Sequence, residues 1–361
     1  MYSMKKYHII LLLITAWTLT ACSSGSEERE GNTMSELITF GNPTLHQASS
    51  ATRGSIFTDI TDLQKSGTDI RVTAKYKNDH GKVYIDNERL QYVDGAWTIN
   101  KYFWLPDTHL DFFAEVVAGN GDMNNFTKSN TTNYTFDYTV PADIAKQYDY
   151  IYAVSLNKYR EEIPLNFTHA LSQIVFTASV AENWNVEIKS ITIHNVSSTG
   201  TFSYETGQWT AQSTASNSYK FELATVKTFN GISSAAPLQA ANDDRLLLMP
   251  QTLNPWVPKV GNDRKPITSA DSEHKSYVEI ECKIKHPSET NYYAGTATSY
   301  GKIYAPIAGT WLPGKKYIYE LPFGYGYTAD GKPTIEQITL SATIVDWETG
   351  ETVPDGTVKF D

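Results

Sequence analysis

The chain has 361 residues, more than one hydrophobic core usually fills, so two domains are expected. Its 23 Tyr, 14 Phe and 8 Trp, with only 19% charged residues, favour an all-β globular protein, because aromatic side chains pack well on sheets. The formal net charge of −10 argues against nucleic acid as a partner, since phosphate binding needs clustered Lys and Arg.

Residues 1–21 have the pattern of a bacterial signal peptide. Lys5 and Lys6 form a basic start, and the apolar run from Ile9 to Leu19 is too short to span a bilayer. We therefore expect this segment to direct export and to form no part of the fold.

The export segment ends at a cysteine that indicates a lipoprotein. The run Leu19-Thr20-Ala21-Cys22 resembles a bacterial lipobox, in which the cysteine is acylated and becomes the new N-terminus. Acyl chains such as palmitate on Cys22 would anchor the protein in the outer membrane. The polar residues 22–35 are expected to be a flexible tether. The alternative is an ordinary signal peptide followed by a chance cysteine.

Strand patterns begin directly after the tether. The run Leu37-Ile38-Thr39-Phe40 predicts a first short strand, and residues 41–54 are typical of a loop, with Arg53 exposed in it. Apolar or alternating runs predict further strands at 69–76, 83–85, 90–93, 96–99, 110–117 and 134–140. Asp94-Gly95 is the strongest hairpin signal, and residues 141–147 predict one helical turn.

The stretch from Asp149 to Val180 contains the expected boundary between two domains. Apolar residues alternate from Leu165 to Leu171, but at Ile174 the apolar set changes parity. A change of parity without a turn residue indicates a bulge or a short break. We therefore predict an N-terminal domain at 36–164 and a C-terminal domain at 165–361.

Further strand patterns follow at regular spacing in the second half. They lie at 186–196, 208–210, 246–249, 277–285, 294–304, 315–321 and 335–347. Such spacing favours antiparallel sandwiches over alternating β-α-β units. No repeat period is present, which argues against a propeller or a solenoid. Cys282 is expected to be a small buried hydrophobic residue, with a reactive thiol as the alternative.

The sequence contains no pattern typical of an enzyme. G-x-S-x-G, P-loop and H-E-x-x-H sequences are absent, and none of the eight His pairs with another at metal-ligand spacing. Glu161-Glu162 are neighbours along the chain and not the facing carboxyls that glycoside hydrolysis needs. We therefore predict no catalytic residue, no metal and no cofactor.

Three aromatic residues are candidates for sugar binding. Trp256 lies in a Pro-rich loop, and Tyr325 and Tyr327 lie in an aromatic run with alternating glycines. Such rings stack on sugars if they are exposed, whereas buried rings would only cap a sandwich. The exposure of these rings decides between the two interpretations.

Six motifs, in order along the chain, resemble the fimbrillin family. The central one, D-x-x-Y-A followed by P-L-x-F-x-H-A-L-S-x-I-x-F, runs from Asp149 to Phe176. The others lie at 97–114, 191–209, 247–251, 311–319 and 338–347. Glu115 stands where the family commonly has Tyr. The resemblance covers about residues 37–350.

The resemblance implies two transthyretin-like antiparallel β-sandwich domains in tandem, in a structural or adhesive subunit of a cell-surface fimbria (type V pilus). In that family an Arg-specific protease cuts after the first strand, and the open groove accepts a strand from a neighbouring subunit. In this sequence the strand to be lost is Leu37, Ile38, Thr39 and Phe40, and the cut follows Arg53. Arg29 precedes the strand, so a cut there would open no groove. The alternative for Arg53 is a solvated loop residue.

The resemblance also implies that the C-terminal end, about residues 346–361, donates a strand. Residues 348–361 are polar and contain Pro354 and Gly356, which suits a donor strand poorly. This departure favours an accessory or tip subunit over a stalk subunit. The expected partners are other fimbrial subunits, the outer membrane through the lipid, and a host glycan or protein. The alternative is a lipid-anchored carbohydrate-binding protein that does not polymerise.

Overall fold

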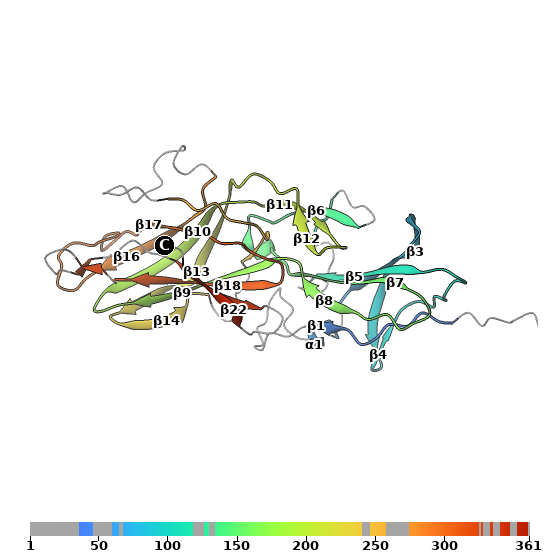
Figure 1. Ribbon diagram of the computed structural model, residues 1–361. Coiled ribbons are helices and arrows are strands. Elements are labelled where there is room, and N and C mark those ends of the chain that lie inside the picture. The colour runs from blue at the N-terminus through green and yellow to red at the C-terminus, as the bar shows by residue number, and fades with distance from the viewer. Residues whose placement is uncertain are drawn as a thin grey trace, which may run out of the picture. The chain divides into compact units, whose positions relative to one another are not determined.

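Strands dominate the computed structural model, and most of them form antiparallel sheets (Figure 1). The structure describes residues 36–45, 60–64, 68–117, 126–129, 134–239, 246–257, 274–324, 326–327, 333–334, 340–346 and 352–359. Within these ranges the helical segments are α1 (Ile60–Leu63) and the 3-10 turn η2 (Ile144–Lys146), and neither is long and apolar enough to cross a membrane. The all-β prediction is confirmed.

One sheet has seven strands in the order β1-β8-β7-β5-β2-β3-β4. The bounds are β1 (Thr44–Leu45), β2 (Ile70–Tyr76), β3 (Asp79–Val93), β4 (Ala96–Thr98), β5 (Leu110–Val117), β7 (Tyr150–Lys158) and β8 (Asn166–His169). Neighbouring strands are antiparallel except β1 and β8, which run parallel. The predicted hairpin joins β3 to β4, and Asp94 and Gly95 have the positive φ values, 51° and 84°, that such a turn requires.

β3 is longer than the sequence pattern predicts. Two short strands were expected where the structure has one continuous strand. Its register against β2 shifts between Val72 and Ala74, and Asn87 has a φ of 50°. Bulges of this kind take up the extra polar residues while the strand continues.

The first hydrophobic cluster is built from alternating residues of this sheet. In β2, for example, Ile70, Val72 and Ala74 are fully buried. β5 is buried on both faces, because Phe112 belongs to this cluster and Phe113 to a second one. β5 is therefore the central strand that apolar residues at both odd and even positions of its sequence predict.

The second cluster lies among the remaining sheets. Their orders are β13-β10-β16-β17, β12-β11-β6, β14-β9-β18-β21-β22 with β15 also paired to β9, and β19-β20. The bounds are β6 (Thr135–Thr139), β9 (Ser172–Val180), β10 (Asn185–Val196), β11 (Thr199–Ser203), β12 (Gln208–Thr210), β13 (Asn217–Asn230), β14 (Ser233–Pro237), β15 (Leu247–Leu248), β16 (Tyr277–Lys285), β17 (Gly301–Pro306), β18 (Lys315–Phe323), β19 (Gly326–Tyr327), β20 (Pro333–Thr334), β21 (Ser341–Asp346) and β22 (Thr352–Lys359).

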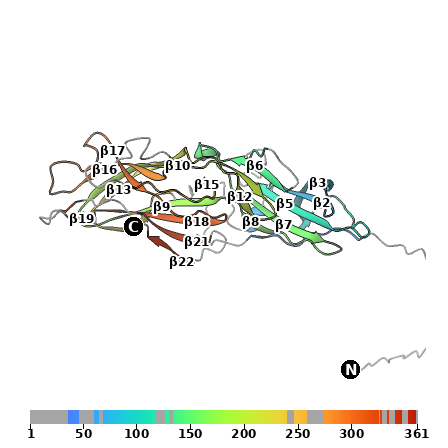
Figure 2. The ribbon, with the colours of Figure 1, turned by 45° about the horizontal axis from the view of Figure 1, so that its top comes forward.

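Two details of these sheets bear on the sequence predictions. β9 and β18 run parallel, as an exception to the antiparallel pattern, and Figure 2 shows β18, β21 and β22 in this order. β16 alternates as predicted, so Cys282 is fully buried. Burial raises the pKa of its thiol to about 12, which leaves it protonated and unreactive at neutral pH.

The parity change predicted at Ile174 corresponds to a break between two strands. β8 ends at His169 and β9 begins at Ser172. Phe167 belongs to the first hydrophobic cluster and Ile174 to the second. β8, from the predicted C-terminal domain, pairs with β7 in the seven-stranded sheet. β6, from the predicted N-terminal domain, pairs with β11 in a different sheet. The domain ranges 36–164 and 165–361 stay a prediction.

Candidate functional site

The predicted first strand is part of a longer segment, residues 36–45, that lies between two other stretches of chain. On one side, the Ile38 N–H donates to the Tyr102 carbonyl, with an N···O distance of 2.8 Å. The Trp104 N–H donates to the Glu36 carbonyl at the same distance. This edge of the segment is therefore paired by backbone hydrogen bonds.

The other edge of the segment is paired as well. The Ile163 N–H donates to the Thr39 carbonyl at 2.9 Å, and the Gly41 N–H donates to the Ile163 carbonyl at 3.0 Å. The Thr44 N–H donates to the Leu165 carbonyl at 2.8 Å, where β1 begins its parallel pairing with β8. We call this position, between residues 102–104 and 163–165, the N-terminal slot.

Side chains of the segment alternate between the core and solvent. Ile38 and Leu45 are 3% and 5% exposed, whereas Leu37 is 39% exposed. The Phe40 ring packs edge-on against Phe112, with centroids 5.9 Å apart. The segment thus contributes apolar surface to the first hydrophobic cluster and is not a loose extension of the chain.

A cavity of about 430 Å³ adjoins the N-terminal slot. It is lined by residues of 37–42, residues 95–101 and Glu162. The indole nitrogen of Trp97 is buried and has no hydrogen-bond partner among the residues that the structure describes. The hairpin of β3 and β4 therefore leaves space beside the segment instead of packing tightly on it.

Several predicted site residues lie outside the described part of the chain. These are the lipidation site Cys22, the cleavage site Arg53 and Tyr325. Tyr327 ends β19, where it pairs with Pro333 of β20. Lipidation and cleavage stay predictions.

Trp256 is buried, although it belongs to neither of the two hydrophobic clusters. Its side chain is 3% exposed and meets Tyr277 edge-on, with ring centroids 6.1 Å apart. A buried indole presents no open face to a sugar ring, so this residue packs as part of the fold.

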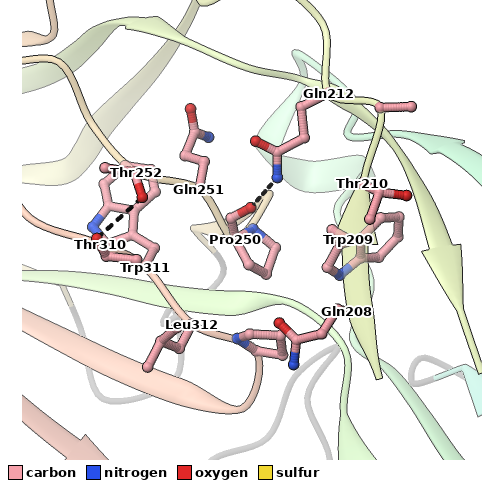
Figure 3. Close-up of a pocket in the computed structure, with 12 residues that line it drawn as sticks. Gln208, Trp209, Thr210, Gln212, Pro250, Gln251, Thr252, Thr310, Trp311 and Leu312 are labelled. Carbon is pink, nitrogen blue, oxygen red and sulfur yellow. Dashed lines mark hydrogen bonds between the residues drawn. The ribbon is translucent and has the colours of Figure 1, made fainter. Parts of the chain in front are cut away.

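A second cavity, of about 380 Å³, was not expected from the sequence (Figure 3). We call it the β12 cavity. Residues 208–212, 250–252 and 310–313 line it. Trp209 and Trp311 belong to the family-like motifs, but the glutamines and threonines around them are common surface residues. The motifs at 191–209 and 247–251 contain Gln208 and Gln251, but nothing in the sequence indicates that these polar residues lie together.

Two polar groups lie near the junction of the two hydrophobic clusters. The His169 Nδ1 lies 2.9 Å from a carboxylate oxygen of Asp149, and the two side chains are 1% and 0% exposed. Because no substrate can reach this pair, it serves to hold the end of β8 against the start of β7.

The second polar group, which is partly buried, centres on Glu115 of β5. Its carboxylate accepts hydrogen bonds from the Lys128 ammonium at 2.5 Å, from the Tyr204 hydroxyl at 2.6 Å and from the Tyr150 hydroxyl. Burial, and then the charge of Glu115, raise the pKa of both phenols, so they stay protonated donors. Nowhere in the described ranges do three His, Cys, Asp or Glu side chains lie close enough to share a metal ion.

The sequence matches the family model described as fimbrillin-like over residues 57–347. A fimbrial protein from Bacteroides vulgatus, known from a crystal structure, is 16% identical, and the match covers 78% of this chain and 93% of that one, with a TM-score of 0.51. A candidate cell adhesion protein from Bacteroides uniformis is 12% identical, with 87% and 99% covered and a TM-score of 0.41. No curated protein matches the sequence. Because the family match spans most of the sequence, the chain belongs to the fimbrillin-like family.

Proposed function

We propose that the protein is a structural, non-enzymatic subunit of a cell-surface fimbria, and that it assembles by β-strand addition. The observation that carries this proposal is the pairing of residues 36–45 along both edges. Loss of the segment would leave the backbone groups of Tyr102, Trp104 and Ile163 without partners and would uncover Phe112. An incoming strand with alternating apolar residues would satisfy those groups and cover the core again.

Cleavage after Arg53 fits this arrangement, because the bond lies between the segment and α1. After the cut, only non-covalent contacts would hold residues 36–45 in the slot, so a strand from a neighbouring subunit could replace them. A cut at Arg29 would leave the segment joined to the rest of the fold. Cleavage at Arg53 would also separate the lipid on Cys22 from the two clusters.

Before the cut, lipid on Cys22 and the tether of residues 22–35 would hold the protein at the outer membrane. A multiply acylated cysteine gives stable anchoring, since each buried methylene contributes about 0.8 kcal/mol. The protein would therefore remain anchored and unassembled at the cell surface until a protease and a neighbouring subunit are both present.

An accessory or tip position is favoured over a stalk position. β22 pairs with β21 in its own sheet, and its sequence is polar and contains Pro354. A subunit whose C-terminal strand is already paired, and which offers few apolar side chains, accepts a strand better than it donates one.

The experiment compares Arg53→Ala with Arg29→Ala in the full chain expressed at the cell surface. We expect wild-type protein and Arg29→Ala to begin at Gly54 and to enter multimers with fimbrial subunits that donate a strand, whereas Arg53→Ala keeps residues 36–45 and stays monomeric. N-terminal sequencing and gel electrophoresis without heating provide the readouts. Multimers that retain Leu37–Phe40 would refute strand replacement.

A further inference from the structure

The β12 cavity has the size of a small-molecule site and a neutral lining. Its volume of about 380 Å³ lies within the usual range of ligand pockets. None of the side chains that line it carries a charge. Three separate stretches of the chain contribute to it, at β12, after β15 and before β18 (Figure 3).

The walls of the cavity are fixed by hydrogen bonds that do not involve a ligand. The Gln251 side chain accepts from the Ser197 N–H at 2.7 Å and donates to the Met249 carbonyl at 3.0 Å. The Trp311 N–H donates to the Gln251 carbonyl at 2.8 Å, and the Trp311 indole N–H donates to the Tyr319 hydroxyl at 2.8 Å. The cavity is therefore formed in advance, which lowers the entropy cost of binding.

Other polar groups around the cavity remain available. The exposed Gln208 amide makes no hydrogen bond within the part of the chain that the structure describes. Gln212 donates its amide N–H to the Pro250 carbonyl, which leaves its side-chain oxygen free to accept. The hydroxyls of Thr252 and Thr310 lie 3.1 Å apart, so one donates to the other and the second hydrogen can point to a ligand.

Apolar surface lies beside these polar groups. This surface comes mainly from Leu312, which is 48% exposed at the rim (Figure 3). Trp209 lines the wall but is only 8% exposed, so little of its indole is open to a ligand. We propose that the β12 cavity binds a neutral saccharide. The hydroxyls of a sugar ring both donate and accept hydrogen bonds, and its C–H face packs on apolar side chains. A charged sugar would lose hydration without gaining an opposite charge.

Two of the three stretches that line the cavity offer few free backbone groups to an extended peptide, and only β12, an edge strand, has an edge without a partner among the described strands. The wall formed by residues 250–252 and 310–312 already uses its backbone groups internally, because Thr252 and Thr310 form an antiparallel bridge. The Leu253 N–H also donates to the Gly309 carbonyl at 2.9 Å. A strand added from outside would therefore meet few unpaired backbone N–H and C=O groups along this wall.

The test uses saturation-transfer difference NMR on the full chain. The probes are the methyl glycosides of glucose, galactose and mannose, N-acetylglucosamine and N-acetylgalactosamine, with glucuronic acid and N-acetylneuraminic acid as charged comparisons. We expect at least one neutral sugar to bind and the acids not to bind. Gln208→Ala, which removes an exposed amide without an internal partner, should weaken binding about five- to tenfold.

Gln91→Ala provides the matched control, because Gln91 is an exposed glutamine on β3 of the seven-stranded sheet, away from the β12 cavity. It should leave sugar binding unchanged. Thr310→Val should weaken binding and keeps the size of the side chain. The proposal is overturned if no neutral sugar binds, if the acids bind equally well, if Gln91→Ala has the same effect as Gln208→Ala, or if a peptide of residues 346–361 displaces the sugar.

This site is independent of strand addition. The β12 cavity and the cavity at the N-terminal slot share no lining residue. Arg53→Ala protein that keeps residues 36–45 should therefore bind the same sugar with the same affinity. A failure of assembly and a failure of sugar binding are thus distinguished in the same set of variants.

Discussion

The two terminal segments of the described chain are held in different ways. Residues 36–45 are hydrogen-bonded along both edges and bury Ile38 and Leu45. β22 pairs with β21 along one edge, where Ser341 lies opposite Lys359 and Val345 lies opposite Thr352. The other edge of β22 has no partner among the described strands. The N-terminal segment thus fills a groove, whereas the C-terminal strand extends a sheet. Only the first arrangement leaves a two-sided acceptor when the segment is removed.

Deleting each segment in turn gives the largest expected effect. Deletion of residues 36–45 removes two buried aliphatic side chains and the hydrogen bonds of two edges, so the free energy of unfolding should fall by about 5 kcal/mol. Deletion of residues 352–361 removes the hydrogen bonds of one edge and should cost about 2 kcal/mol. Urea unfolding of both variants measures the difference.

Adding a synthetic peptide of residues 36–45 to the first deletion variant should recover most of the lost stability. A peptide with the same composition in scrambled order serves as the control, because it cannot place apolar residues at alternate positions. If the C-terminal deletion is the more costly of the two, the interpretation of the slot as the stronger attachment is wrong.

A single substitution tests the same comparison with a smaller expected loss of stability. Ile38→Ala should lower the free energy of unfolding by about 3 kcal/mol, because Ile38 is 3% exposed and the change leaves a cavity beside the core. Leu37→Ala is the matched control and should cost less than about 1 kcal/mol, since Leu37 is 39% exposed. Equal losses of free energy in the two variants would mean that the alternation of buried and exposed side chains in the slot does not determine stability.

Alternation along the sequence predicts much of this fold. β2 and β16 follow from their apolar period of two, the β3–β4 hairpin from Asp94-Gly95, and the all-β class from composition. Pairing partners do not follow in the same way. Nothing local distinguishes the parallel pairing of β9 and β18 from an antiparallel one, because both need the same alternating side chains.

The candidate sites differ in how far the sequence predicts them. The strand at Leu37–Phe40 has a clear apolar pattern, so its place in a sheet could be expected. The two edges that hold it come from residues about 65 and 125 positions away, and local patterning does not specify such distant partners. The β12 cavity unites three stretches through Gln and Thr side chains, which are too common on surfaces to stand out.

The buried Asp149–His169 pair tests how β8 supports the slot. Asp149→Asn replaces a carboxyl oxygen that contacts the buried His169 ring and should lower the free energy of unfolding by about 2 kcal/mol. Because β1 pairs with β8, loosening β8 should also loosen the segment that contains β1. Deuterium uptake measured by mass spectrometry should therefore rise in residues 36–45 and not in residues 352–359. Asp107→Asn, the same change at an exposed residue, should alter neither.

High pH gives the smallest expected effect and acts on one edge of the slot. The half-buried Tyr102 donates its hydroxyl to Glu88 at 2.8 Å, and its carbonyl accepts from the Ile38 N–H. Burial, followed by the hydrogen bond to Glu88, raises the pKa of Tyr102 to about 12. The fold therefore favours the protonated phenol, and this contribution is complete below the unfolded pKa of about 10 and is lost as the pH rises to about 12.

Tyr102→Phe separates this contribution from that of the other tyrosines, since those titrate equally in both proteins. Between pH 10 and 12 the melting temperature of the wild-type protein should fall by about 1 °C more than that of Tyr102→Phe, as measured by circular dichroism. Below pH 9 the difference between the two melting temperatures should be constant. Parallel curves across the whole range would show that Tyr102 is not stabilised in its protonated form, and the pH sensitivity of the slot would then have to come from another group.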